Sequence, residues 1–147
     1  MEEEKKNFCR CLYYSVNGLS RLITKIADDC FAPTKLTSSY AFLLMIVNNR
    51  NGISPKEISL IMQLSPSTVT RLVDKMVIKG LLDRTFNKKN SLIFSTEKSK
   101  ELDPLIRQCW RNLYIAYSEV LGEEVSKKLT EDIYASYNIL EEKFNLI

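Results

Sequence analysis

One segment in the middle of the chain constrains the fold more than any other, because both ends of a helix are marked in it. Ser65 is an N-cap residue, Pro66 takes the first helical position, and Gly80 stands where helices commonly end in a left-handed conformation. Between these ends, apolar residues recur at the i, i+3, i+4, i+7 spacing of a helix. This spacing predicts one buried stripe, formed by Val69, Leu72, Val73 and Met76.

The opposite side of the same helix carries short hydroxyl groups and cations. Such side chains suit contacts with a phosphate backbone and with base edges. On an isolated helix, Arg71 would be an ordinary solvated arginine and Ser65 a simple cap, but together with their neighbours they favour DNA contact. The candidate contact residues on this helix are Ser65, Ser67, Thr68, Thr70, Arg71 and Lys75.

The flanking segments predict a helix-turn-helix followed by a wing. Residues 54–57 read Ser-Pro-Lys-Glu, a capping-box arrangement that begins a short helix, which ends at residues 63–64 just before Ser65. Residues 81–86 and 91–95 have the pattern of two short strands around a polar, basic turn. We expect Lys88 and Lys89 in that turn to contact phosphates. Arg84 is a further contact candidate, although it could instead pair with Asp74.

Long amphipathic helices are predicted on both sides of this lobe. The first runs over about residues 5–29 with a heptad-like apolar seam, a second over 37–49, and two more over 97–121 and 123–144. Pro104 lies inside the third and requires a kink or a later start. The outer helices carry more apolar surface than one small lobe can cover, so we expect a two-fold dimer. Its recognition helices would lie about 34–36 Å apart.

Composition bounds the class of protein. The 147 residues are 45% apolar, enough for one domain with its own core. No apolar run reaches the length of a membrane span and the first residues are no secretory signal, so we expect a cytoplasmic protein. The net charge is +3, but residues 53–90 carry seven cations and three acids. A polyanionic partner would therefore meet the middle of the chain.

The residue types needed for several kinds of chemistry are missing. The chain has no histidine, its four cysteines form no CxxC pair, and it has no glycine-rich phosphate loop. We therefore predict no catalytic residues, no metal site and no cofactor, and the chain is not expected to be an enzyme.

The pattern resembles the MarR family of bacterial transcriptional regulators. The resemblance is densest in SPSTVTRLVDKM at 65–76, KGLLDR at 79–84 and STEKS at 95–99, where serine replaces the family's usual glycine. It implies a mainly α fold: a winged helix-turn-helix lobe over 36–100, a small β-hairpin wing, and dimerisation helices over 5–30 and 100–145 of one domain, 1–147. It also implies a homodimer that binds a pseudo-palindromic DNA operator, mostly as a repressor. The wing departs from the family, because its turn has lysines where an arginine usually enters the minor groove.

The resemblance further suggests two modes of regulation. Family members often hold aromatic effectors in a cleft beside the dimer helices, which makes Tyr13, Tyr14, Trp110 and Tyr114 a candidate effector pocket, near Tyr117, unless these rings simply pack the dimer core. Some members sense peroxides through a cysteine near the start of the first helix, which makes Cys9 and Cys11 candidate redox residues. However, Ser38 stands where a supporting tyrosine is expected, and a cysteine in a seam is more often a small hydrophobe.

A different class of function fits the same features. A winged-helix module could use its basic face to bind an acidic protein rather than DNA. A salt titration separates the two, because DNA binding displaces counterions and gives a steep dependence of affinity on salt.

Overall fold

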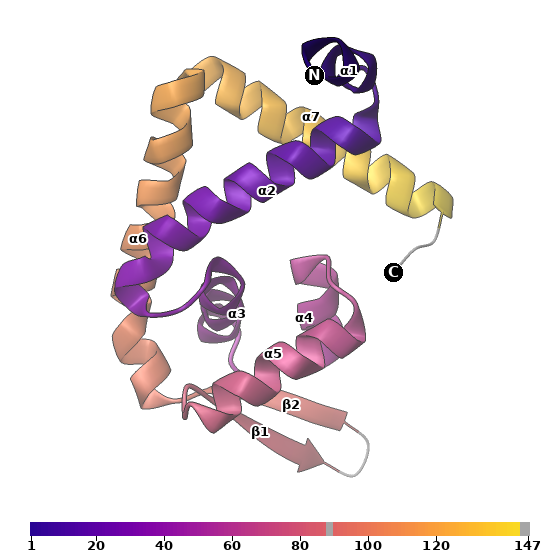
Figure 1. Ribbon diagram of the computed structural model, residues 1–147. Coiled ribbons are helices and arrows are strands. Elements are labelled where there is room, and N and C mark those ends of the chain that lie inside the picture. Colours follow the sequence, from indigo (N-terminus) through magenta and orange to yellow (C-terminus); the bar gives the residue numbers. More distant parts are fainter. Residues whose placement is uncertain (88–89, 145–147) are drawn as a thin grey trace.

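The structure is a computed structural model (Figure 1) that describes residues 1–87 and 90–144. It is mainly helical with one two-stranded antiparallel hairpin, so the predicted fold class is confirmed. Three long helices form an open frame in the upper part of Figure 1, and a smaller lobe hangs below them. The elements are α1 (Glu2–Phe8), α2 (Leu12–Phe31), the 3-10 turn η1 (Ala32–Thr34), α3 (Ser38–Asn49), α4 (Pro55–Met62), α5 (Pro66–Ile78), β1 (Leu82–Asn87), β2 (Asn90–Ser95), α6 (Glu97–Leu121) and α7 (Glu123–Phe144).

The core of the lobe lies between α3, α5, the hairpin and the first half of α6. Val69, Val73 and Met76 of α5 are fully buried there, as the sequence predicted, and Leu72 is half-buried. Leu43, Leu44 and Val47 of α3, Leu82 of β1, Ile93 of β2 and Ile106 of α6 complete it, and all are fully buried. Burying a side chain of this kind stabilises a fold by about 1.5–3 kcal/mol, so this contact fixes the position of α5.

Side-chain caps set the start of both helices of the helix-turn-helix. The Ser54 hydroxyl accepts a hydrogen bond from the Glu57 amide at 3.3 Å, and the Glu57 carboxylate accepts one from the Ser54 amide at 3.1 Å. The Ser54 hydroxyl, and after it the Ser54 amide, donate hydrogen bonds to the Glu57 carboxylate and lower the pKa of Glu57, since its charged form is the acceptor. Between the helices, Gln63 turns the chain with a left-handed backbone, at φ 55°. The predicted capping box and turn are both present.

The hairpin is attached to the lobe at its base. Ile53 forms a β-bridge to Ile93 of β2, and the Gly52 amide donates to the Ile93 carbonyl at 2.9 Å. Gly52 has a left-handed backbone, at φ 84°, and its Cα faces the Phe94 ring so closely that an added Cβ would stand 3.1 Å from it. The wing therefore rises from a fixed base rather than from a loose loop.

The N-terminal helix differs from the expectation of one continuous segment. It is divided into α1 and α2, with Cys11 in an extended conformation as the N-cap of α2. The Cys9 thiol donates to the Lys6 carbonyl, and the Ser15 hydroxyl donates to the Cys9 carbonyl. Side chains thus bond backbone carbonyls at the break between the two helices. All residues of α1 are exposed, and α1 contacts α2 through the Phe8 ring, which stacks on Tyr14.

A polar network joins α3 to α6. The Asn48 side-chain amide donates to Asp103 Oδ1 at 3.0 Å and its oxygen accepts from the Ser99 hydroxyl at 3.0 Å. Arg107 pairs with Asp103 through Nε, and its Nη2 donates to Asn49 Oδ1 at 2.6 Å. The first turns of α6 are thereby held against the lobe, and the helix begins at Glu97 and continues through Pro104 rather than starting later.

By length and composition, no single helix among residues 1–87 and 90–144 could cross a membrane. The bent pair formed by residues 12–34 with 38–49 passes that test together.

Candidate nucleic-acid interface

The first turn of α5 presents its hydroxyl groups to solvent. The Ser65 hydroxyl accepts a hydrogen bond from the Thr68 amide at 3.3 Å and lies 2.8 Å from the Thr68 hydroxyl and 3.1 Å from that of Ser67. Ser65 and Ser67 are exposed and Thr68 is half-buried. The positive end of the helix dipole lies at the same turn, so this is a place where a phosphate could be received.

Further along α5, one row of cations faces solvent. Arg71 and Lys75 are both exposed and are spaced by one helical turn. The Lys75 ammonium lies 6.0 Å from the centre of the Tyr40 ring, so α3 guides it from one side. Thr70 is also exposed, but its hydroxyl donates to the Pro66 carbonyl at 2.9 Å, which limits its freedom. The polar side of α5 is therefore open to a partner, as a recognition helix requires.

Arg84 occupies a different position from the other candidates. Its Nη1 lies 2.9 Å from Asp74 Oδ1, and the Arg84 side chain is only 19% exposed. Its Nε is buried and has no hydrogen-bond partner among the described residues. The pairing with Asp74 that the sequence suggested is present, and it joins the end of α5 to β1. Arg84 therefore lies at the junction of helix and wing rather than on the open face.

The described part of the wing ends before its tip. Lys88 and Lys89 lie outside the described residues, so their predicted phosphate contacts stay predictions. The backbone register of the strands pairs Arg84 with Ile93 and Phe86 with Ser91. Phe86 is 80% exposed near the end of β1, which sequence reasoning did not single out.

The candidate effector residues separate into two places. Trp110 and Tyr114 border one hollow on α6, of about 410 Å³, which Arg111, Ile115 and Tyr117 also line. Burial and the nearby Tyr114 raise the pKa of Tyr117, so it remains a neutral phenol there. Tyr13 and Tyr14 lie at the start of α2, where Tyr14 stacks on Phe8 with ring centres 5.7 Å apart. The structure thus joins two of the four predicted residues and leaves the other two apart.

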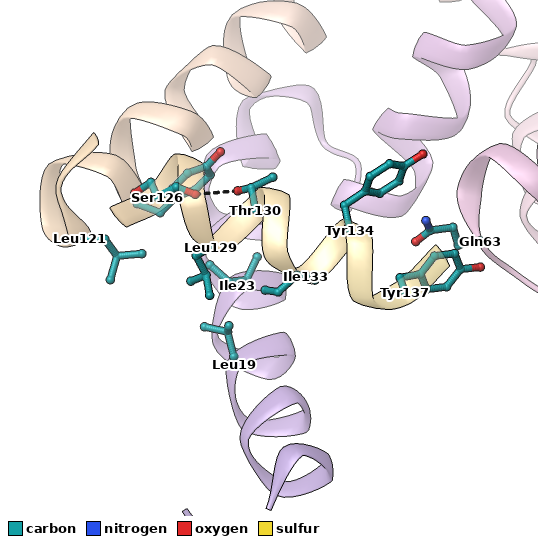
Figure 2. A pocket seen from close by; sticks show the side chains of 11 residues that line it. Leu19, Ile23, Gln63, Leu121, Ser126, Leu129, Thr130, Ile133, Tyr134 and Tyr137 are labelled. Atoms are coloured by element: carbon teal, nitrogen blue, oxygen red, sulfur yellow. Dashed lines mark hydrogen bonds between the residues drawn. The ribbon is translucent and has the colours of Figure 1, made fainter. Parts of the chain in front are cut away.

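A second apolar groove was not predicted from the sequence. It lies between α2, α6 and α7 (Figure 2) and has a volume of about 410 Å³. Gln63, from the turn before α5, closes one end beside Tyr137 of α7. Ser126 lies in its wall, and its hydroxyl oxygen is buried without a hydrogen-bond partner in the part that the structure describes. Residues from four separate elements line it, so no single sequence pattern could have marked it.

The two candidate redox residues are accessible. Cys9 and Cys11 are exposed at the break between α1 and α2, whereas Cys109 is buried in α6. Burial, and secondarily the neighbouring Cys30, raises the pKa of the Cys109 thiol. Within residues 1–87 and 90–144, no three His, Cys, Asp or Glu side chains are grouped so that they could hold a metal ion.

The fold is shared with solved transcriptional regulators. The M. tuberculosis regulator MosR is 18% identical, with a TM-score of 0.80 over 92% of this chain and 98% of that one. The repressor CouR bound to a 23-mer DNA duplex is 17% identical, with a TM-score of 0.78 over 87% and 93%. CouR from Rhodococcus jostii RHA1 bound to p-coumaroyl-CoA is 19% identical, with a TM-score of 0.70 over 92% and 94%. No curated protein matches the chain.

A capped, outward-facing helix on a lobe with a β-hairpin defines the chain as a winged helix-turn-helix protein. Residues 36–91, which hold α3, α4, α5 and most of the wing, match the model of the MarR family. The match bears out the resemblance to this family over the lobe that carries α3, α4 and α5.

Proposed function

We propose that this protein binds a pseudo-palindromic DNA operator as a homodimer and represses transcription there. The observation that carries the proposal is the open polar face of α5, where hydroxyls and cations stand outward while the apolar stripe is buried. We assign the DNA contacts to Ser65, Ser67, Thr68, Thr70, Arg71 and Lys75, with Lys88 and Lys89 of the wing. Arg84 would act mainly by holding the wing against α5.

The homodimer follows from apolar surface that one copy leaves open. Along α2, α6 and α7, large apolar side chains are exposed in numbers unusual for a protein that remains a monomer. They include Leu12, Val16, Leu22, Val120, Val125, Ile133, Tyr134, Ile139, Leu140 and Phe144. The groove of Figure 2 lies on the same helices, and we assign it to helices of the second copy. A two-fold pair would place two copies of α5 in successive major grooves, about 34–36 Å apart.

Repression would follow from occupying the operator. The similar protein CouR is a transcriptional repressor whose structure holds a 23-mer DNA duplex. A protein with this task works where the DNA lies, which for a bacterial regulator is the cytoplasm.

An aromatic effector would bind the hollow lined by Trp110 and Tyr114. The two rings and Ile115 provide apolar contact, and Arg111 provides a cation for an acidic group. Trp110 is the chain's one tryptophan, so its fluorescence reports on this site alone. Titration with salicylate and with p-coumarate should change that emission and weaken DNA binding together. Emission that does not respond to either compound would remove the hollow from this role for this class of acid.

The central experiment selects an operator from a random-sequence library and measures affinity by fluorescence anisotropy, with sedimentation for the oligomeric state. Arg71→Ala should weaken operator binding by about 1–3 kcal/mol if Arg71 contacts bases, and it should leave the dimer intact. Lys127→Ala, an exposed cation on α7, is the matched control and should change little. A protein that stays monomeric, or that enriches no sequence, would refute the proposal.

A redox-sensing form of this regulator rests on the exposure of Cys9 and Cys11. Hydroperoxide should release DNA from the wild type, and Cys9→Ser or Cys11→Ser should abolish that release. The alternative of a protein-binding module predicts instead a shallow salt dependence with DNA and no selected operator.

A further inference from the structure

A second group of cations lies beyond the end of α5, outside the recognition surface that the sequence indicated. Lys79 follows Lys75 by one helical turn and, as the C-cap of α5, still has a right-handed helical backbone, so it extends the row begun by Arg71 and Lys75. It also stands at the rim of an open hollow of about 620 Å³.

Two more lysines, far apart in sequence, meet Lys79 at this hollow. Lys98, in the first turn of α6, donates from its ammonium to the Lys79 carbonyl at 3.2 Å. Lys35, just after η1, lines the same hollow. All three are exposed, and the carboxylate of Glu101 is the acidic group that lines it with them. The hollow therefore carries an excess of positive charge, and the nearly buried Leu36 and Leu81 form part of its floor.

Tyr40 links the start of α3 to the cations of α5. Its ring lies under the Lys75 ammonium, so the start of α3 stands beside the cationic row of α5. Lys35 precedes α3 by a few residues and borders the hollow next to the end of that row. Arg71, Lys75 and Lys79 follow one another by one helical turn each, and Lys79 meets Lys98 and Lys35 at the hollow, so cations lie along α5 and around its C-terminal end.

We propose that the hollow bounded by Lys35, Lys79 and Lys98 is a second contact site for the DNA backbone, which receives phosphates beyond the groove that α5 enters. The inference rests on the proposed DNA-binding function and adds a surface to it. The backbone phosphates of DNA fit the site because the three lysines are spread around an open rim and follow the cations of α5. A single small anion could contact only a few of these lysines at once. Lysine is a compact point charge suited to phosphate and carries no base preference.

Salt dependence tests this assignment directly. The double variant Lys35→Gln with Lys98→Gln is compared with Lys127→Gln with Lys143→Gln, which removes the same charge from exposed positions on α7. Each phosphate contact contributes about 0.9 to the slope of log affinity against log salt, so the first variant should lose about two units of slope per protomer. The control pair should keep the slope of the wild type.

Two duplexes of equal length, the selected operator and an unrelated sequence, complete the test. The loss should be the same factor on both, because phosphate contacts do not read sequence. If the slope of the Lys35/Lys98 variant equals that of the control pair, the inference is wrong even though the wild type prefers its operator. A wild type without any operator preference would instead refute the proposed function.

The fold of the variants is checked by thermal unfolding, because Lys98 bonds the end of α5. Should the double variant be unstable, Lys35→Gln alone should lower the slope by about one unit per protomer, whereas Lys98→Arg alone, which keeps the charge and a donor, should keep the slope of the wild type. An unchanged slope in Lys35→Gln would again overturn the assignment.

Discussion

Asp74 on α5 and Arg84 on β1 form an ion pair, with Oδ1 and Nη1 2.9 Å apart. The pair is the polar link between the recognition helix and the wing, above the apolar contact of Met76 and Leu82 with the core. Asp74 stands on a face that would meet DNA, where an unpaired carboxylate would repel phosphates. Since its charge is offset by Arg84, the face keeps its positive character.

The first prediction concerns this pair. Asp74→Asn and Arg84→Gln should each lower the free energy of unfolding, and the double variant should lose less than the sum. The coupling should be about 0.5–1 kcal/mol, because Asp74 is half exposed and solvent screens the pair. Urea unfolding of the four proteins measures it. Strictly additive losses would mean that the two residues do not stabilise one another.

The polar network between α3 and α6 gives a second prediction. Asp103→Ala removes one of the two acceptors of the Asn48 side-chain amide and the carboxylate partner of Arg107, so each half-buried group loses one bond. The free energy of unfolding should fall by about 1–3 kcal/mol. Glu119→Ala, at an exposed position of the same helix, is the control and should change it by less than about 0.5 kcal/mol. Equal effects of both variants in urea would contradict the role of the network.

The third prediction uses two glycines in opposite situations. Gly52→Ala should destabilise the protein by about 1–2 kcal/mol, since its φ of 84° disfavours a side chain and the new Cβ would press on Phe94. Gly18→Ala should stabilise it by about 0.5–1 kcal/mol, because Gly18 lies within α2 with nothing within 4 Å of an added Cβ. Differential scanning calorimetry reads both shifts. Shifts of the same sign would show that local backbone conformation does not decide these positions.

The fourth prediction concerns thiol reactivity. Burial raises the pKa of the Cys109 thiol and shields it, so at mildly alkaline pH it has little of the reactive thiolate. Iodoacetamide should therefore modify the exposed Cys9 and Cys11 well before Cys109, and labelling of Cys109 should rise with pH. Timed alkylation followed by peptide mass spectrometry measures this order. In urea all the cysteines should react alike, and early labelling of Cys109 in the native protein would contradict the expected burial.

Local signals made the helix-turn-helix predictable. Ser54, Glu57 and Ser65 begin their helices through bonds to residues three positions away, and such bonds depend on sequence spacing alone. The buried stripe of α5 was likewise predictable because one helical period decides which side faces the core. The pairing of Asp74 with Arg84 could be proposed, since both ends of that contact lie close together along the chain.

Features that depend on distant segments escaped prediction. Nothing in the sequence marks the break at Cys11, because neither proline nor glycine stands there and the outcome depends on what packs against α1. Lys35, Lys79 and Lys98 meet only once α6 folds back along the lobe. The groove beside Gln63 and Tyr137 similarly exists only once α2, α6 and α7 have packed against one another. Tyr13 and Tyr14 seemed to belong with Trp110 because helix patterns alone do not give the separation between helices.

The left-handed corner at Gln63 ties two tasks to one residue. A glycine would adopt that backbone more cheaply, but it would leave the end of the groove beside Tyr137 without a wall. Ser65, the N-cap of α5, follows two positions later. If a helix of a second copy fills the groove, as proposed, it would contact Gln63 and so act on the turn that precedes α5. Dimer formation and DNA reading would then be coupled through this one residue.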